Sequence, residues 1–291
     1  MIRALIHRWQ RWHSGSVWLR APVKVFLFLA LVILTLYPKV WLIPTWLGRE
    51  RDLNSVLDPA NPALAPLEAE ARAALPESAT SKQLLDTVEN VVYRHVPYAW
   101  DWDVWGVVDY LPTVTEVFQM GREDCDGRAV VAASLLRRMG HEAWIVSDIL
   151  HMWVETPQGE TMSPTGGEKT LVGEPGGTKP HINWGIIDNL VRGNAYGIAV
   201  FPMGRELLLI AGLAFLRLHP RSNGWRSFSG LLLMLLALAI ARGVGQQAAL
   251  QHARASTVMF IGALLLFAAG GILIGIKVAI RRPDSVAAPP G

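Results

Sequence analysis

Two residues of this chain have the types and order that covalent chemistry needs. The single cysteine, Cys125, and the histidine His151 lie in the run Gly121–Glu155, which reads GREDCDGRAVVAASLLRRMGHEAWIVSDILHMWVE. The cysteine stands at the start of a predicted helix, and the histidine stands near the start of a later predicted strand. This order is typical of a thiol nucleophile and its base. A lone cysteine also excludes an intrachain disulfide, so the thiol is available for use.

The residues around Cys125 act on its thiol in opposite directions. A helix N-terminus offers unpaired N–H groups and partial positive charge, which lower the pKa of a thiol. The neighbouring acids Glu123, Asp124 and Asp126 raise it. A cationic partner such as His151 is therefore expected to hold the thiolate, and the same N–H groups could stabilise an oxyanion.

The elements that must position this pair are a buried helix and an antiparallel sheet. The helix has apolar residues from Ala129 to Met139 on nearly every face and ends at Gly140. Three strands are expected after it, at residues Trp144–Ser147, Met152–Glu155 and Glu160–Ser163. The glycine-rich stretch Pro164–Pro180 is predicted to be a loop. Together these elements indicate an α+β domain with the cysteine helix packed on the sheet.

Upstream of the cysteine, the sequence predicts two helices and an aromatic loop. Ser81–His95 has apolar residues at helical spacing with Ser81 as its cap, and Thr113–Met120 forms a short second helix. Tyr98–Tyr110 alternates aromatic and acidic residues. Its rings either pack the loop onto the domain, with the acids in solvent, or form the wall of a substrate groove. The candidate groove residues are Trp100, Trp102 and Trp105.

The two ends of the chain are basic and apolar, whereas the middle is acidic. Residues 1–47 have six bases and no acid, residues 207–291 have eight bases and one acid, and residues 48–206 have a net charge of −10. Because the bases flank apolar runs, this pattern favours a membrane protein over a nucleic-acid-binding one. Three runs are long enough to span a bilayer and a fourth is shorter. They are Val25–Ile43, Phe228–Gly245, Thr257–Ile280 and Glu206–Leu218.

With four spans, the basic loops and both termini share the cytoplasmic side, and the acidic middle is exported. The first span is expected to be an uncleaved anchor, and the membrane is expected to be a bacterial cytoplasmic membrane. We divide the chain into a basic amphipathic lead-in, an anchor, a linker with a short helix, an exported domain ending in a membrane-surface helix, a membrane region of about three helices, and a cytoplasmic tail. Their residues are 1–24, 25–47, 48–80, 81–200, 201–282 and 283–291.

The pattern Gly-x-x-x-Cys-x-Gly at a helix start, followed by a strand with His-x-Trp-x-Glu, resembles the transglutaminase-like superfamily. The matching residues run from Gly121 through Cys125 and Gly127 to His151 and Glu155. The resemblance covers about residues 81–165 and implies a papain-like cysteine-enzyme fold. It implies that Cys125 is the nucleophile and His151 the base.

The third member of the family's catalytic set differs in this chain. Family members usually have Asp-Pro-Thr on the strand after the histidine, where the aspartate orients the imidazole. Here the run is Ser163-Pro164-Thr165. A serine hydroxyl can accept a hydrogen bond from the ring but supplies no charge to stabilise imidazolium. Ser163 is therefore the third candidate site residue, in a position where a carboxylate is expected.

These observations predict a membrane-anchored cysteine peptidase, amidase or acyltransferase that forms an acyl-thioester on Cys125. The expected partners are a protein or peptide substrate, the lipid bilayer and a membrane protein, without nucleic acid, cofactor or metal. A metal site would have to combine Cys125 with Asp124, His141 and His151, and the sequence lacks a closely spaced ligand pair. Two alternatives stay open: a catalytically weak or inactive binding module that uses the aromatic loop, and a membrane scaffold with an incidental insert.

Overall fold

The computed structural model describes residues 8, 11–12, 15–148, 151–164, 169–174, 177–181, 186–250 and 255–276. The chain divides into two compact units. One unit consists of Leu36–Asn194, and the other consists of Met1–Thr35 together with Ala195–Gly291. Each unit is described separately below.

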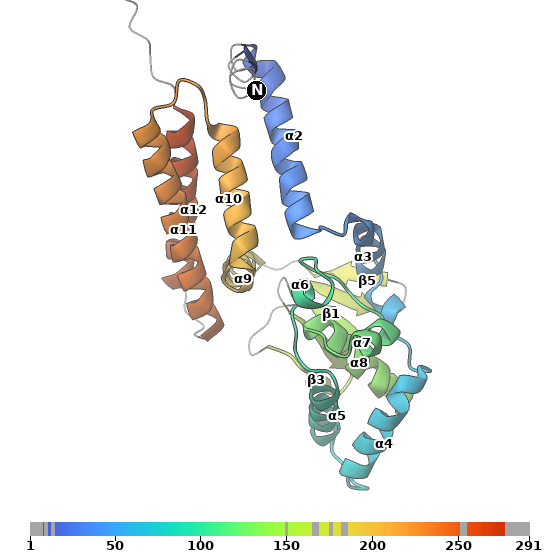
Figure 1. Cartoon of the computed structure of the whole chain (residues 1–291). Helices are drawn as coiled ribbons and strands as arrows, with labels where there is room; N and C mark the ends of the chain where they lie inside the picture. The colour runs from blue at the N-terminus through green and yellow to red at the C-terminus, as the bar shows by residue number, and fades with distance from the viewer. Residues whose placement is uncertain are drawn as a thin grey trace, which may run out of the picture. The chain divides into compact units, whose positions relative to one another are not determined.

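The first unit contains a small antiparallel sheet, drawn in green and yellow in Figure 1. Its five strands are arranged in the order β3-β2-β1-β4-β5. Strand β1 lies in the centre and pairs with β2 on one side and β4 on the other. The strands are β1 (Trp144–Ser147), β2 (Met152–Thr156), β3 (Gly159–Thr161), β4 (Leu171–Glu174) and β5 (Gly177–Pro180).

Helix α8 (Cys125–Arg138) packs on β1 and β2 and forms the centre of this unit. Nine of its fourteen residues are buried. A helix that is apolar on nearly every face can exist in a soluble unit only when other elements surround it. Those elements are α4 (Ala65–Ala74), α5 (Ser81–His95), α7 (Val114–Met120) and the sheet. The short helix α6 (Asp101–Val104) belongs to the aromatic loop.

The segment before α5, expected to be a linker, is packed into the core. It forms α3 (Ile43–Glu50) and the 3-10 helices η1 (Val40–Leu42), η2 (Leu53–Val56) and η3 (Pro62–Leu64). The leucines that open η2 and close η3 are both fully buried. The Leu53 N–H donates to Thr178 Oγ1 of β5 at 2.9 Å, and the Asp58 N–H donates to Ser134 Oγ of α8 at 3.1 Å. These bonds join the segment to both layers of the unit.

Several local predictions for this unit are confirmed, and two are wrong. The helices at residues 81–95 and 114–120, the helix that begins at Cys125 and the first strands are present. Gly140 has φ +93°, as a glycine that ends a helix often has. The cap of α5 is Thr80 with Gln83 in a capping box, rather than Ser81. The stretch Pro164–Pro180 is not one loop, because β4 and β5 lie within it.

The second unit contains long apolar helices. They are α2 (Val17–Leu36), α9 (Ile186–Val200), α10 (Met203–Arg217), α11 (Gly224–Leu250) and α12 (Ala255–Gly275), of which α2 and α9 begin or end at its border with the first unit. Within the described residues, three helices are long and apolar enough to cross a membrane. Helices α9 and α10 meet at a 104° bend, and they bring the number to four if they form one broken span. The chain therefore has the helices of a membrane protein.

The first span differs from its predicted bounds. Helix α2 ends at Leu36, earlier than the predicted end at Ile43. The reason is Pro38, because a proline disfavours helical geometry in the residue before it. The helix also begins at Val17, before the predicted start at Val25, so Arg20 and Lys24 lie inside it, whereas Lys39 lies beyond its end.

A close backbone contact and an ion pair hold the apolar helices of the second unit together. Where α11 crosses α12, an added Cβ on Gly230 would lie 2.6 Å from the carbonyl oxygen of Gly270, so the backbones approach as closely as glycine allows. Near the bend between α9 and α10, Arg242 of α11 pairs with Glu206 at 2.5 Å and donates to the Phe201 carbonyl at 2.9 Å. A carboxylate within an apolar helix is costly unless it is paired, and this ion pair supplies the partner for Glu206.

Candidate functional site

Cys125 is the first residue of α8, and the local sequence explains why the helix starts there. Asp124 is the N-cap, and its carboxylate accepts from the Asp126 N–H at 3.1 Å. Gly127 lies over the buried side chain of Glu123, where an added Cβ would be 2.3 Å from the Glu123 Cγ. The helix start is therefore built tightly around the cysteine.

The thiol of Cys125 is half-buried and has two polar neighbours. It donates a hydrogen bond to Asp126 Oδ1 at 3.4 Å, and the Met152 backbone N–H donates to its sulfur. Burial raises the pKa of the Cys125 thiol well above its usual range, and the charges of Asp126 and Asp124 add to the increase. The resting form is thus the neutral thiol. The lowering effect expected from the helix N-terminus is outweighed.

His151 directly precedes β2 and is fixed at both its backbone and its ring. Its backbone N–H donates to Asp148 Oδ1 at 2.7 Å, and its ring Nε2 lies 2.8 Å from the carbonyl oxygen of Met162. Because a carbonyl oxygen only accepts, Nε2 has the hydrogen, and the neutral ring offers Nδ1 as an acceptor. The ring also stacks on Trp153, with centroids 6.3 Å apart.

The structure brings the cysteine helix and the histidine strand together through Met152. This residue follows His151 in the chain, and its N–H contacts the Cys125 sulfur. Among the described residues, no hydrogen bond joins the thiol to the imidazole, whose Nε2 is bound to Met162. The residue after His151 therefore contacts the Cys125 sulfur, and the thiol proton is held by Asp126.

Ser163 does not meet the imidazole through its hydroxyl. It is exposed and follows the end of β3, whereas the preceding residue, Met162, supplies the carbonyl that holds the ring. Met162 has φ +63°, an uncommon value for a residue with a side chain. Its own N–H donates to Glu89 Oε2 at 3.0 Å, which fixes this conformation. A backbone carbonyl thus orients the ring without supplying charge. Thr165 of the resemblance lies outside the described residues.

The three candidate groove tryptophans flank or form α6 and are half-buried. Trp100 and Trp102 stack with centroids 4.9 Å apart, and Tyr98 meets Trp100 edge-on at 5.1 Å. Trp105 points elsewhere, because its Nε1–H donates to the Glu123 carboxylate. Trp100 and Trp102 therefore lie together, whereas Trp105 is bound to the buried carboxylate of Glu123.

Of the three acids of the aromatic loop, Asp101 is buried, Asp109 is half-buried and Asp103 is exposed, so the expectation that they lie in solvent holds only for Asp103. Asp101 is 2% exposed, Glu123 is 0% exposed and Asp124 is 8% exposed. The Tyr110 N–H donates to Asp101 Oδ2 at 2.5 Å, whereas Asp101 Oδ1 is buried without a hydrogen-bond partner among the described residues.

Five acids from two chain segments gather here, and we call them the carboxylate cluster. They are Asp101, Asp109, Glu123, Asp124 and Asp126. Within two trios, one oxygen of each member lies within 4.8 Å of the others, and the trios are Asp101 with Glu123 and Asp124, and Asp101 with Asp109 and Asp126. These are the described groups best suited to hold a metal ion, since carboxylate oxygens suit hard cations.

Burial raises the pKa of every member of the carboxylate cluster, and repulsion from neighbouring acids adds to the increase for every member except Asp109. Burial, followed by the charge of Asp124, raises the pKa of Glu123 to about 8, and burial raises the pKa of Asp124 to about 7. Burial also raises the pKa values of the other three aspartates. So many acids in one interior are costly unless protons or a cation neutralise them.

Sequence reasoning missed this cluster, although part of its signal was visible. The run Glu123-Asp124-Cys125-Asp126 at a helix start placed three acids beside the thiol. Their partners, Asp101 and Asp109, come from the aromatic loop, whose acids were expected to lie in solvent. Only the folded loop brings the two segments together.

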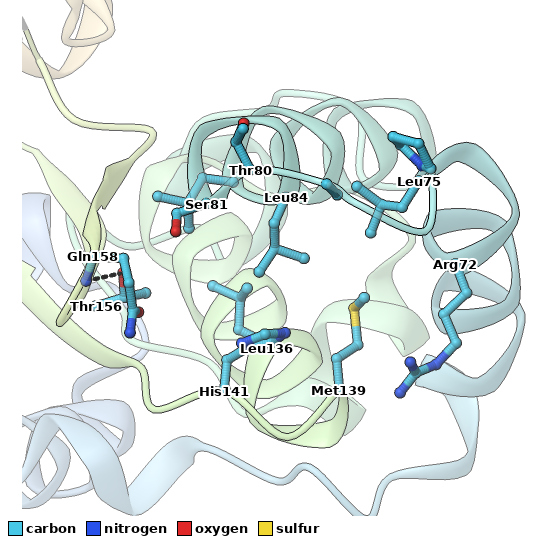
Figure 2. A pocket seen from close by; sticks show the side chains of 13 residues that line it. Arg72, Leu75, Thr80, Ser81, Leu84, Leu136, Met139, His141, Thr156 and Gln158 are labelled. Atoms are coloured by element: carbon cyan, nitrogen blue, oxygen red, sulfur yellow. Dashed lines mark hydrogen bonds between the residues drawn. The ribbon is translucent and has the colours of Figure 1, made fainter.

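A pocket of about 310 Å³ lies elsewhere in the first unit, as Figure 2 shows. Its walls include Leu84 of α5 and Leu136 of α8, and His141 stands at its edge (Figure 2). Leu136, whose carbonyl accepts from the His141 N–H, is at the opposite end of α8 from Cys125, about 17 Å away at 1.5 Å per residue. The pocket is therefore separate from the cysteine site. The same distance excludes a metal site that combines His141 with Cys125.

Comparisons of the chain with protein-family models, with curated proteins and with solved structures found no match. The function is therefore argued from the geometry of the site.

Proposed function

We propose that this protein is a membrane-anchored cysteine enzyme of transglutaminase-like type that cleaves or transfers an amide or peptide bond. The observation that supports it most directly is the packing of the α8 start against the β2 start. There the Met152 N–H contacts the Cys125 sulfur, and the adjacent His151 is held by its Nε2. A thiol at a helix start beside an oriented imidazole is the minimum set for acyl transfer.

In the proposed reaction, His151 acts as a general base. Because the thiol is neutral at rest, its proton leaves for His151 Nδ1 as the sulfur attacks the carbonyl carbon. The N–H groups at the start of α8 stabilise the resulting oxyanion. The protonated ring then gives its proton to the departing amine, which leaves an acyl-thioester on Cys125. Water or a second amine, deprotonated by the same ring, releases the acyl group and restores the thiol.

The Asp126 hydrogen bond gives this mechanism a specific requirement. The thiol proton points to Asp126 Oδ1 at 3.4 Å, so the Cys125 side chain must turn toward His151 before transfer. In the proposed mechanism, substrate fills the site and excludes water, and this drives the rotation of the Cys125 side chain. The Met162 carbonyl keeps the ring in the required tautomer during the turn.

The proposed placement is a bacterial cytoplasmic membrane, with both termini in the cytoplasm and Leu36–Asn194 outside. Three helices of membrane-spanning length and the basic flanks support this arrangement. The substrate is then a protein or peptide outside the cytoplasm, close to the bilayer. A reporter fused after Ser55 that stays cytoplasmic would overturn the placement.

Thiol labelling of the full chain in detergent tests the enzyme proposal. A peptide-like electrophile should modify Cys125 faster than it modifies free cysteine, and His151→Ala should reduce that rate at least tenfold. Ser163→Ala, which changes an exposed hydroxyl, should leave the rate unchanged. Labelling of wild type and His151→Ala at the same slow rate would refute the dyad.

The second candidate is a binding or assembly module that retains the fold without the reaction. The observation that favours it is the raised pKa of the Cys125 thiol, because a protonated thiol is a poor nucleophile. The exposed part of the Trp100–Trp102 stack would then be the contact surface. His151→Ala distinguishes the two functions, since loss of the base should reduce the rate of an enzyme and leave the partner binding of a binding module unaffected.

A further inference from the structure

We infer that the carboxylate cluster binds one hard divalent cation of the calcium class. The inference goes beyond the proposed function, because it needs neither Cys125 nor His151 to react. It rests on three observations: the spacing of the carboxylate oxygens, an orphaned buried oxygen on Asp101, and the shortage of basic partners in the interior.

The spacing of the oxygens fits a coordination sphere. One oxygen from each member of a trio lies within 4.8 Å of the others. Oxygens bound to the same Ca²⁺ lie about 2.3–2.6 Å from it and therefore no more than about 5 Å from one another. Asp101 belongs to both trios, so a single ion beside it can draw ligands from the aromatic loop and from the helix start.

Asp101 provides the observation that points to a ligand. Its side chain is 2% exposed, and only its Oδ2 accepts a hydrogen bond, from the Tyr110 N–H. The other oxygen, Oδ1, is buried with no hydrogen-bond donor among the described residues, and the Asp101 side chain instead meets the carboxyl group of Glu123. A buried carboxylate oxygen without a donor is costly, and a coordinated cation removes that cost.

Basic side chains do not fill this role in the described structure. Arg128 lowers the pKa of Asp124, but its guanidinium group lies over the rings of Tyr93 and Tyr98, at 4.6 and 5.0 Å from their centroids. Its Nε donates to the Val96 carbonyl at 2.9 Å. Among the described residues, the cluster thus has three buried and two half-buried carboxylates, and the guanidinium group beside them is partly engaged elsewhere.

The chemistry of the ligand set selects the ion. An all-oxygen carboxylate set favours hard cations over zinc or copper. Calcium accepts six to eight oxygens in irregular geometry, whereas Mg²⁺ requires a near-octahedral sphere and retains its waters. A site built from the aromatic loop and a helix start has irregular geometry and therefore suits calcium. The Cys125 sulfur lies within the same spacing of Asp124 and Asp126, but sulfur ligands suit soft metals and a hard cation does not select it.

Terbium luminescence tests the inference on the full chain in detergent after treatment with a chelator. Tb³⁺ is a calcium substitute that emits when nearby tryptophans are excited, and Trp105 contacts the cluster through Glu123. We expect saturation at one Tb³⁺ per chain and displacement by Ca²⁺ at lower concentration than by Mg²⁺. Calcium should also raise the unfolding temperature of the same sample.

Matched variants assign the site. Asp101→Asn keeps an acceptor for the Tyr110 N–H and should weaken Tb³⁺ and Ca²⁺ binding at least tenfold. Asp103→Asn changes an exposed acid in the same turn and should bind like wild type. Cys125→Ser should also bind like wild type, which separates this inference from the enzyme proposal.

Two results would overturn the site. The first is wild-type protein that shows no saturable binding of Tb³⁺ or Ca²⁺ and no change in unfolding temperature, which would mean that shared protons neutralise the acids. The second is wild-type affinity in both Asp101→Asn and Asp126→Asn, which would place the ion elsewhere. If Asp101→Asn fails to fold, the wild-type titration and Asp126→Asn still decide the question.

Discussion

Gly127 offers a sharp test of how the candidate site is built. In an ordinary helix, replacing glycine with alanine gains about 1 kcal/mol, because alanine loses less backbone entropy on folding. At Gly127 the new methyl group would lie 2.3 Å from Glu123 Cγ and 2.9 Å from Val117 Cγ2. Both neighbours are buried, and such overpacking costs about 1–3 kcal/mol. After subtracting the gain of about 1 kcal/mol, we expect Gly127→Ala to destabilise the first unit by up to about 2 kcal/mol.

The matched control is Gly48 in α3 of the same unit. No heavy atom outside its immediate helix neighbourhood lies within 4 Å of a Cβ added there, so Gly48→Ala should stabilise the unit by about 0.5–1 kcal/mol. The assay is denaturant unfolding of the full chain in detergent, followed by tryptophan fluorescence. A stabilising Gly127→Ala, similar to Gly48→Ala, would show that Glu123 does not lie under the helix start and would refute the construction of the site.

Two further predictions concern ion pairs of the two units. Burial raises the pKa of Glu116, but hydrogen bonds from Arg49 and Thr113 outweigh burial and lower it below its ordinary value. Glu116→Gln should thus lower the free energy of unfolding by about 1–3 kcal/mol at neutral pH. The loss should shrink as pH falls below about 4.5, because the wild-type carboxylate then becomes protonated and loses the same charge. An equal loss at pH 3 and pH 7 in denaturant titrations would contradict this. In the second unit, Arg242→Met should lower the stability of the folded unit by about 3–5 kcal/mol, because it leaves Glu206 unpaired, and the double variant with Glu206→Gln should recover most of that loss. Protease resistance in detergent measures the stability of both variants. A double variant as easily digested as the single one would argue against the ion pair.

Sequence periodicity predicted the elements of the first unit where one physical effect dominated. The helix that begins at Cys125 was predictable because its apolar residues leave no polar face, and Gly140 marked its end. The strands β4 and β5 were not predictable, because the glycines between Pro164 and Pro180 are typical of loops. Strand β4 pairs with β1 at Ser147, and Thr178 of β5 accepts a hydrogen bond from the N–H of Leu53, which is distant in the chain.

The candidate site was predictable in its residues and less so in its contacts. Cys125 and His151 were identified by type and order, whereas the carbonyl that orients the ring belongs to Met162, and a backbone atom leaves no signal in residue types. The inward direction of Asp101 could not be inferred either. Acids between tryptophans are usually solvated, and only the packing of α6 against the helix start reverses this.

The central claim is that Cys125 accepts an acyl group with the help of His151. The most direct measurement is the intact mass of the full chain, quenched in acid after brief incubation with an activated acyl ester, which loses its alcohol as the thioester forms. We predict one acyl group per chain on Cys125 in wild type and in Ser163→Ala, none in Cys125→Ala, and at least tenfold less in His151→Ala. Equal acylation of wild type and His151→Ala, or no acylation of Cys125 at all, would contradict the account.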